Sequence, residues 1–357
     1  MEINPNFWRG KRVFLTGHTG FKGSWMAMWL HRLGATVIGY SLEPPSQPSL
    51  FDLAQIATRI DHQLGDIRDR DKLEQAMVQA NPDLVIHMAA QSLVRLSYGQ
   101  PVETYATNVM GTVHLLDGVR RLSNIQAVIC VTSDKCYENM EWERGYREED
   151  PFGGSDPYSS SKGCSELVVN AYRRSFLKEM GVRLASVRAG NVIGGGDWAT
   201  DRLIPDLVRS LSEKKHPQIR NPQAIRPWQH VLNTLAGYLI LAEKMMSPEG
   251  HNYAEGWNFG PADEDAIPVA EVVNRLCTFW GLESDWHRDS GNHPHEAKFL
   301  KLDASKAHAR LGWRPVWNLD QALQEVVSFT RKWQEGYDVG SVLMDHLADY
   351  ERDLSQL

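Results

Sequence analysis

The chain has 357 residues and a formal net charge of −7, with 42% hydrophobic and 23% charged residues. This length allows one large domain or two modest ones around a sizeable core. The acidic balance argues against a nucleic-acid partner, which would call for a basic face. No apolar run reaches the roughly 20 residues of a membrane helix, so we expect no membrane partner.

The cysteines and the N-terminal residues both indicate the cellular compartment in which the protein is expected. Cys130, Cys136, Cys164 and Cys277 show neither C-x-x-C spacing nor a paired framework, which fits a reducing compartment. The first residues, MEINPNFWRGK, lack the basic-then-apolar layout of a signal peptide. We therefore expect a cytoplasmic protein.

Short apolar runs alternate with helical patterns through the first half of the chain. Strands are expected over 12–16, 36–41, 83–90, 127–133 and 182–190, and helices over 25–34, 71–79, 102–119 and 157–174. This alternation predicts an α/β fold, a doubly wound parallel sheet of the Rossmann type. Residues 1–190 are expected to form this dinucleotide-binding domain. Residues 191–357 are expected to form a smaller substrate-binding lobe, with some segments returning to the sheet.

The first expected strand runs directly into a glycine-rich turn. Gly17, Gly20 and Gly23 form G-x-x-G-x-x-G between that strand and a helix. Glycines at these positions let the backbone approach a pyrophosphate, whose charge the helix N-terminus favours. The position between strand and helix predicts dinucleotide binding.

An acidic residue for the cofactor ribose is late or missing. The second strand ends at Ser41, and the nearest acid beyond it is Glu43, so the spacing leaves the choice between NAD and NADP open. Asp66, after a third short strand, could accept a hydrogen bond from adenine. Alternatively, Asp66 or Asp69 is a helix N-cap.

Tyr158 and Lys162 lie four residues apart in an expected helix, which places them on one face, one turn apart. An ammonium beside a phenol favours the phenolate and lowers the tyrosine pKa. A drop from about 10 to about 7 needs roughly 4 kcal/mol, which a partly buried pair and a cofactor charge could supply. Such a tyrosine could take a proton from a sugar hydroxyl while hydride leaves the same carbon.

The glycine loop, TSDK at 132–135 and YSSSK at 158–162 together resemble the extended short-chain dehydrogenases/reductases that act on nucleotide sugars. Longer stretches are similar to the CDP-glucose branch of the 4,6-dehydratases: TGHTGFKGSW, MAAQSLVRLSY, TNVMGT, RAGNVIGGGDWATDRLIPD and RPWQHV. The resemblance covers nearly the whole chain. It implies NAD as cofactor, CDP-glucose as substrate, a product used in deoxysugar biosynthesis, and a homodimer formed through helices near 101–122 and 157–179. The cofactor contacts that it implies are Gly17, Thr19, Gly20, Phe21, Gly23, Asp66, Ile67, Ala89, Ala90, Tyr158 and Lys162.

The resemblance also implies a role for Asp134 and Lys135, which follow the strand expected over 127–133. Ser133, or alternatively Thr132, would hold the C4 hydroxyl with Tyr158 and Lys162 while C4 is oxidised. Asp134 would protonate the departing C6 oxygen and Lys135 would remove the C5 proton. Many 4,6-dehydratases carry Glu where this chain has Lys135. Lys135 could instead only stabilise an enolate, and the pair could be a surface salt bridge.

Candidate substrate ligands lie in the second half of the chain. Asn191, Arg202 and Arg226 are expected by resemblance to contact the diphosphate and sugar, with structural ion pairing as the alternative. His287, His293 and His295 do not match a metal-ligand spacing, so we expect no metal.

Two other functions stay open on the sequence. A nucleotide-sugar 4-epimerase would share Tyr158 and Lys162 but would not need the Asp134–Lys135 pair. A dinucleotide-binding sensor without catalysis would be free to lose Ser133, Tyr158 and Lys162, all of which are present.

Overall fold

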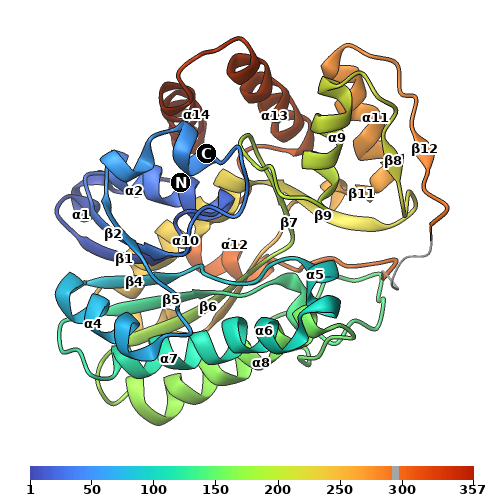
Figure 1. Ribbon diagram of the computed structural model, residues 1–357. Helices are drawn as coiled ribbons and strands as arrows, with labels where there is room; N and C mark the ends of the chain where they lie inside the picture. Colours follow the sequence, from blue (N-terminus) through green and yellow to red (C-terminus); the bar gives the residue numbers. More distant parts are fainter. Residues whose placement is uncertain (292–296) are drawn as a thin grey trace.

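A seven-stranded, entirely parallel sheet organises the chain in the computed structural model, which describes residues 1–291 and 297–357 (Figure 1). In spatial order the strands are β10 (Gly256–Phe259), β6 (Arg183–Ala189), β5 (Ala127–Val131), β4 (Leu84–His87), β1 (Arg12–Thr16), β2 (Thr36–Ser41) and β3 (Asp61–Leu64). Each neighbouring pair runs parallel.

Both faces of this sheet are buried under helices. Side chains alternate along a strand, so Val13 and Leu15 of β1 enter one hydrophobic core and Phe14 enters the other. The first core is covered by α2 (Phe21–Arg32), α10 (Val231–Met245), α12 (Ser305–Leu311) and α14 (Val339–Ser355). The second is covered by α4 (Arg70–Ala80), α7 (Gly111–Val119) and α8 (Pro157–Tyr172). The expected doubly wound, Rossmann-type sheet is confirmed.

One expected helix is interrupted. The segment predicted as a single helix over 102–119 consists of α6 (Pro101–Tyr105), a π-helical turn (Ala106–Met110) and α7. A short helix, α5 (Val94–Gly99), precedes it. Within the described residues no helix is both long and apolar enough to cross a lipid bilayer.

The second half of the chain builds a smaller lobe beside the carboxyl ends of the strands (Figure 1). Its strands are β7 (Asn191–Ile193), β9 (Ile225–His230) and β11 (Ala266–Pro268) in one sheet, and β8 (Gln218–Ile219) and β12 (His287–Arg288) in another. Its helices are α9 (Leu203–Ser212), α11 (Val269–Trp280) and α13 (Leu319–Gln334), which share a separate hydrophobic core. The division of the chain near residue 190 stays a prediction, although β10 does return to the main sheet.

The turn between β1 and α2 depends on backbone contact at two of its three glycines. A Cβ on Gly17 would lie 2.6 Å from the Ala89 nitrogen, and one on Gly23 would lie 2.0 Å from the Gly17 carbonyl oxygen. Gly17 also has a φ of +78°, which glycine adopts most readily. Gly20, the N-cap of α2, has room, because its Cβ would find its nearest atom at 3.5 Å.

We therefore predict that Gly23→Ala lowers the free energy of unfolding by about 1–3 kcal/mol, because the methyl group overpacks the turn. Gly20→Ala is the matched control and should change stability by less than about 1 kcal/mol. Urea unfolding of both variants measures the difference. Equal destabilisation by the two changes would show that the close approach at Gly23 does not limit stability.

Candidate active site

A large pocket follows the carboxyl ends of the parallel strands and continues under the smaller lobe. Its volume is about 2010 Å³. It opens where the chain, having added β2 and β3 on one side of β1, returns to place β4 on the other side. Open α/β sheets bind their ligands at this kind of switch point. Every residue predicted as a cofactor, catalytic or substrate contact lines this pocket.

The glycine loop provides a cradle suited to a dinucleotide. Gly20 presents its open side at the start of α2, where unpaired backbone N–H groups favour a phosphate. The Thr19 hydroxyl donates to the Leu42 carbonyl oxygen at 2.9 Å and lies 2.7 Å from the Ser41 hydroxyl. These contacts hold the loop against the end of β2, so the residues fit the expected NAD.

Asp66 does not cap a helix. Asp69 is the N-cap of α4 and accepts from the Lys72 N–H at 3.2 Å. The Asp66 carboxylate pairs with Arg68, whose Nη2 lies 2.6 Å from its Oδ2. Burial alone would raise the pKa of Asp66, but the hydrogen bonds and charge of Arg68 lower it overall. A carboxylate is therefore present at this wall of the pocket.

Tyr158 and Lys162 lie on the first two turns of α8, which Asp156 caps by accepting from the Ser159 N–H at 2.9 Å. Tyr158 is 7% exposed and Lys162 is 5% exposed. Burial lowers the pKa of Lys162 to about 8, and its ammonium donates to the Val131 carbonyl oxygen at 3.2 Å.

The expected fall of the Tyr158 pKa is wrong for this structure. Burial of the phenolate raises the pKa of Tyr158 to about 12, and a hydrogen bond with Ser133 opposes that shift without cancelling it. Spacing on a helix predicted a favourable cation, but it could not predict how completely the surrounding chain removes Tyr158 from water.

The TSDK segment turns sharply after β5. Ser133 caps a short 3₁₀ helix (Asp134–Cys136), accepts from the Lys135 N–H at 3.2 Å and donates to Asp134 Oδ1 at 3.0 Å. Asp134 is 1% exposed, and its Oδ2 has no hydrogen-bond partner among the described residues. Lys135 Nζ lies 3.7 Å from Asp134 Oδ1, and its side chain is 29% exposed. A surface salt bridge is therefore wrong, because the acid is buried at the pocket wall.

Ser133 and Thr132 point to different surroundings. Ser133 reaches the phenol of Tyr158. The Thr132 hydroxyl donates to Glu166 Oε1 at 2.5 Å and lies 3.3 Å from the Val187 carbonyl oxygen. Of the two alternatives for holding a sugar hydroxyl, this geometry favours Ser133.

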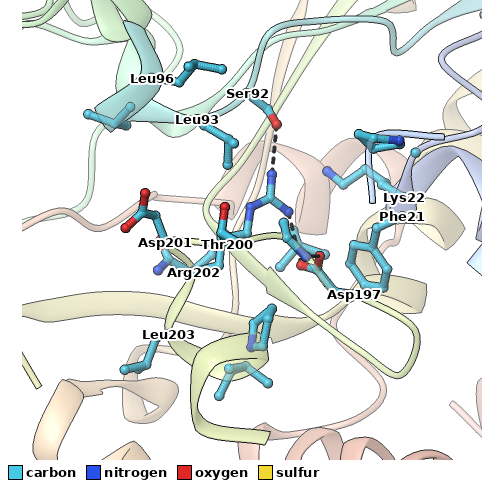
Figure 2. A pocket seen from close by; sticks show the side chains of 18 of the residues that line it. Phe21, Lys22, Ser92, Leu93, Leu96, Asp197, Thr200, Asp201, Arg202 and Leu203 are labelled. Atoms are coloured by element: carbon cyan, nitrogen blue, oxygen red, sulfur yellow. Dashed lines mark hydrogen bonds and ion pairs between the residues drawn. The ribbon is translucent and has the colours of Figure 1, made fainter. Parts of the chain in front are cut away.

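The predicted substrate ligands lie at the lobe side of the pocket. Asn191 opens β7, and Arg202 is the N-cap of α9. Figure 2 shows the Arg202 guanidinium between Ser92 and Asp197, with 2.8 Å from Nη2 to Ser92 Oγ and 3.1 Å from Nη1 to Asp197 Oδ2. Arg226 on β9 donates to the carbonyl oxygens of Ile225 and Ala297, so it also fastens the segment that follows residue 296.

Sequence reasoning missed Lys22, which lines the same pocket next to Phe21 (Figure 2). Its ammonium lies 3.4 Å from the Tyr238 hydroxyl and 5.4 Å from the centre of that ring. Burial and the charges of Arg202 and Lys162 lower the pKa of Lys22 to about 7, against the opposing charge of Asp134. The signal was a lysine at the start of an otherwise apolar helix, FKGSWMAMWL.

The histidine-rich segment falls only partly within the described residues. His293 and His295 lie outside them. His287 lies on β12. It forms an exposed group with His216 and Asp285, whose potential ligand atoms and its own lie within 4.8 Å of one another. The expectation of a metal-free function stays a prediction.

Known proteins resemble this chain over nearly its full length. The GDP-mannose 4,6 dehydratase family matches residues 14–326. A CDP-glucose 4,6-dehydratase of Salmonella typhimurium is 54% identical over 353 residues, covering 98% of each chain. A dTDP-glucose 4,6-dehydratase of Haemophilus influenzae is 26% identical and covers 90% of this chain and 97% of its own.

Solved structures share the fold. A UDP-glucose 4-epimerase of Thermotoga maritima has a TM-score of 0.79 at 19% identity and covers 90% of this chain and 99% of its own. A dTDP-glucose 4,6-dehydratase of Bacillus anthracis in complex with NAD has a TM-score of 0.76 at 23% identity, covering 92% and 99%. Because the family matches residues 14–326 and the Salmonella typhimurium relative is 54% identical over 98% of each chain, the chain belongs to the GDP-mannose 4,6 dehydratase family.

Proposed function

We infer that this chain converts CDP-D-glucose to CDP-4-keto-6-deoxy-D-glucose and water, with NAD as cofactor. The observation that carries this inference is the Asp134–Lys135 pair at the end of β5, facing the same pocket as Tyr158 and Lys162. CDP-glucose as the substrate rests on the relative that is 54% identical over 98% of both chains.

A bound NAD would supply the hydride acceptor for oxidation at C4 of the sugar and the hydride donor for reduction at C6. The residues that would hold it are those of the glycine loop, Asp66, Ile67, Ala89, Ala90 and Lys162, all of which line the pocket.

Tyr158 takes the proton of the C4 hydroxyl, and Ser133 holds that hydroxyl. Tyr158 must be deprotonated to do so, and burial opposes deprotonation. The Ser133 hydrogen bond and the charge of Arg202 act in the favourable direction by lowering the pKa of Tyr158. Lys162, one turn along α8, adds a cation at this end of the pocket.

Asp134 and Lys135 serve the elimination that follows. The C4 ketone acidifies the C5 hydrogen; Lys135 takes that proton as the electron pair forms the C5–C6 double bond. The C6–O bond breaks, and Asp134 supplies the proton that turns the departing hydroxyl into water. The unpartnered, buried Oδ2 of Asp134 is the oxygen available for this transfer. Return of hydride to C6 and of a proton to C5 completes the product without net redox change.

Arg202, Asn191 and Arg226 are proposed ligands of the diphosphate and sugar. The Arg202 guanidinium lies in the pocket, where it donates to the Asp197 carboxylate. A diphosphate offers the same guanidinium two further anionic groups. Arg226 would act mainly by fastening the segment after residue 296 against the lobe.

The proposal is tested with purified protein, NAD and the CDP, UDP, GDP and dTDP esters of glucose. We expect a product lighter by one water from CDP-glucose, with the other esters poorer substrates. An isomer of unchanged mass would favour the epimerase, which shares the fold but has no use for Asp134 and Lys135. NAD binding without conversion of any ester would favour the sensor.

The role of Lys135 is tested by two substitutions. Lys135→Ala should leave C4 oxidation in place and abolish C5 proton exchange with solvent, because the base is gone. Lys135→Arg keeps a cation that does not deprotonate at working pH, so it should not restore exchange. Exchange of C5 deuterium followed by NMR gives the answer. Normal exchange in Lys135→Ala would show that another group is the base, and rescue by Arg would show that Lys135 only stabilises an enolate.

We further propose a homodimer formed through α6, α7 and α8, which lie together on one side of the molecule (Figure 1). These helices and the turns beside them expose large apolar side chains, among them Val102 at 73%, Leu167 at 57% and Met110 at 46%. Burying a contiguous apolar surface drives association.

Leu167→Glu should shift the molar mass measured by light scattering from dimer toward monomer. Leu282→Glu, at a residue 46% exposed on the other lobe, is the matched control and should not. A wild-type monomer, or equal effects of the two changes, would contradict this dimer.

A further inference from the structure

A buried ion pair lies directly beneath the TSDK turn. Arg188 of β6 and Glu166 of α8 have side chains 3% and 2% exposed, and they meet in a two-pronged contact, with 2.8 Å from Nε to Oε1 and 2.8 Å from Nη2 to Oε2. Each carboxylate oxygen also accepts a hydroxyl, Oε1 from Thr132 at 2.5 Å and Oε2 from Ser186 at 2.7 Å. Burial alone would raise the pKa of Glu166, but Arg188 and these hydroxyls lower it overall, so the group is a carboxylate.

This pair reaches both ends of the turn. Thr132, bonded to Glu166, immediately precedes Ser133. Tyr137, two residues after Lys135, accepts from Arg188 Nη1 at 2.6 Å through its hydroxyl. The four residues between Thr132 and Tyr137 include the proposed acid and base. The ion pair thus contacts a residue on each side of Asp134 and Lys135. It does so alongside the Thr132 N–H bond to the Val187 carbonyl oxygen at 2.9 Å and the Tyr137 hydroxyl bond to Asn258 Oδ1 at 2.7 Å.

The backbone of the turn is held by the Cys136 N–H, which donates to the Ser133 carbonyl oxygen at 3.3 Å, and by the Gly153 N–H, which donates to the Cys136 carbonyl oxygen at 2.9 Å. The Asp134 side chain has fewer contacts. Asp134 is linked to its neighbours by the Ser133 hydroxyl at 3.0 Å and the Lys135 ammonium at 3.7 Å, and its second oxygen has no partner in the described chain. The place of this carboxylate in the pocket therefore depends on how the backbone of the turn is held, both at its two ends and through Cys136.

The same helix carries the other half of the site. Glu166 follows Lys162 by four residues, and Lys162 follows Tyr158 by four, so the three side chains lie along one face of α8. The ion pair therefore joins the helix of the oxidation residues to the turn of the elimination residues.

We propose that Glu166 and Arg188 are positioning residues that set the acid–base turn of Asp134 and Lys135 at a fixed place relative to Tyr158 and Lys162. This inference rests on the proposed function. A buried ion pair is weak evidence for added stability, since its desolvation cost can exceed its attraction, which leaves room for a role in geometry. A purely structural role would affect oxidation and elimination alike, whereas a positioning role separates them.

The test uses Thr132→Val and Tyr137→Phe, which each release one end of the turn and leave the ion pair in place. C4 oxidation is followed by absorbance of the reduced nicotinamide in a single turnover with CDP-glucose. Elimination is followed by C5 deuterium exchange and by loss of water. We expect oxidation to stay within about threefold of wild type and elimination to fall about ten- to a hundredfold, since an ångström of misplacement has effects of that size. Thr132→Ser restores the hydroxyl and should recover elimination.

The matched control is Ser165→Ala, beside Glu166 on α8. Ser165 is buried and donates to the Asn108 and Ser161 carbonyl oxygens, away from the turn. Its loss should lower the melting temperature and leave the ratio of oxidation to elimination unchanged.

Four results would overturn the proposal. Equal slowing of both steps in Thr132→Val and Tyr137→Phe would assign the cluster to folding alone, and unchanged elimination would remove any role. If Thr132→Val slows oxidation by a larger factor than elimination, both relative to wild type, Thr132 would instead hold the C4 hydroxyl. Failure of the wild type to oxidise CDP-glucose would contradict the proposed function itself, and this inference with it. If Tyr137→Phe does not fold, Thr132→Val and its Ser rescue decide the question.

Discussion

Parallel pairing of β1 with β4, and of β4 with β5, is the constraint on which the site depends. Parallel strands end at one edge of the sheet, so the segments that follow them meet there. The glycine loop follows β1, Ala89 and Ala90 follow β4, and the acid–base turn follows β5. Residues as far apart in the chain as Gly17 and Lys135 are thereby brought to one pocket.

Burial of charge at this edge is the second physical feature of the site. Asp134, Lys162 and Glu166 are each at most 5% exposed, a state that charged side chains rarely reach unless they are compensated. Glu166 is fully compensated by Arg188 and two hydroxyls, whereas Asp134 keeps one oxygen without a partner in the described chain. We interpret Glu166 as a residue that holds the site in place and Asp134 as a residue that reacts. Other buried atoms, such as Arg59 Nε and Gln229 Oε1, also lack a partner in the described chain, so this interpretation rests on the position of Asp134 in the pocket beside Tyr158.

Local patterns in the sequence predicted the parts of the site that local geometry builds. The glycine turn between a strand and a helix, and Tyr158 one turn before Lys162, depend on residues fewer than ten positions apart, and the structure has both. The five strands given bounds from the sequence were predictable for the same reason, because each contains its own apolar run. β3 has the sequence DHQL without a buried residue, so no such run marks it. The lobe after residue 190 was predicted without the bounds of its helices and strands, since its short strands pair with partners far along the chain.

The missed features all depend on contacts distant in sequence. Thr132 points to Glu166, 34 residues later, and Arg226 is held by a carbonyl 71 residues later. The pKa of Tyr158 moved opposite to the expectation because burial sums over the whole surrounding structure, which spacing on one helix does not reveal. Lys22 was overlooked because its neighbours Tyr238 and Arg202 lie in segments that no local motif connects to the glycine loop.

The most direct test of the central claim follows one hydrogen atom. CDP-glucose carrying deuterium at C4 is incubated with the protein and NAD, and the product is examined by NMR and mass spectrometry. The account predicts loss of one water with the deuterium found at C6 of the same sugar, because oxidation at C4 and reduction at C6 take place in one pocket. Deuterium retained at C4 in a product of unchanged mass, or lost to solvent, would contradict it.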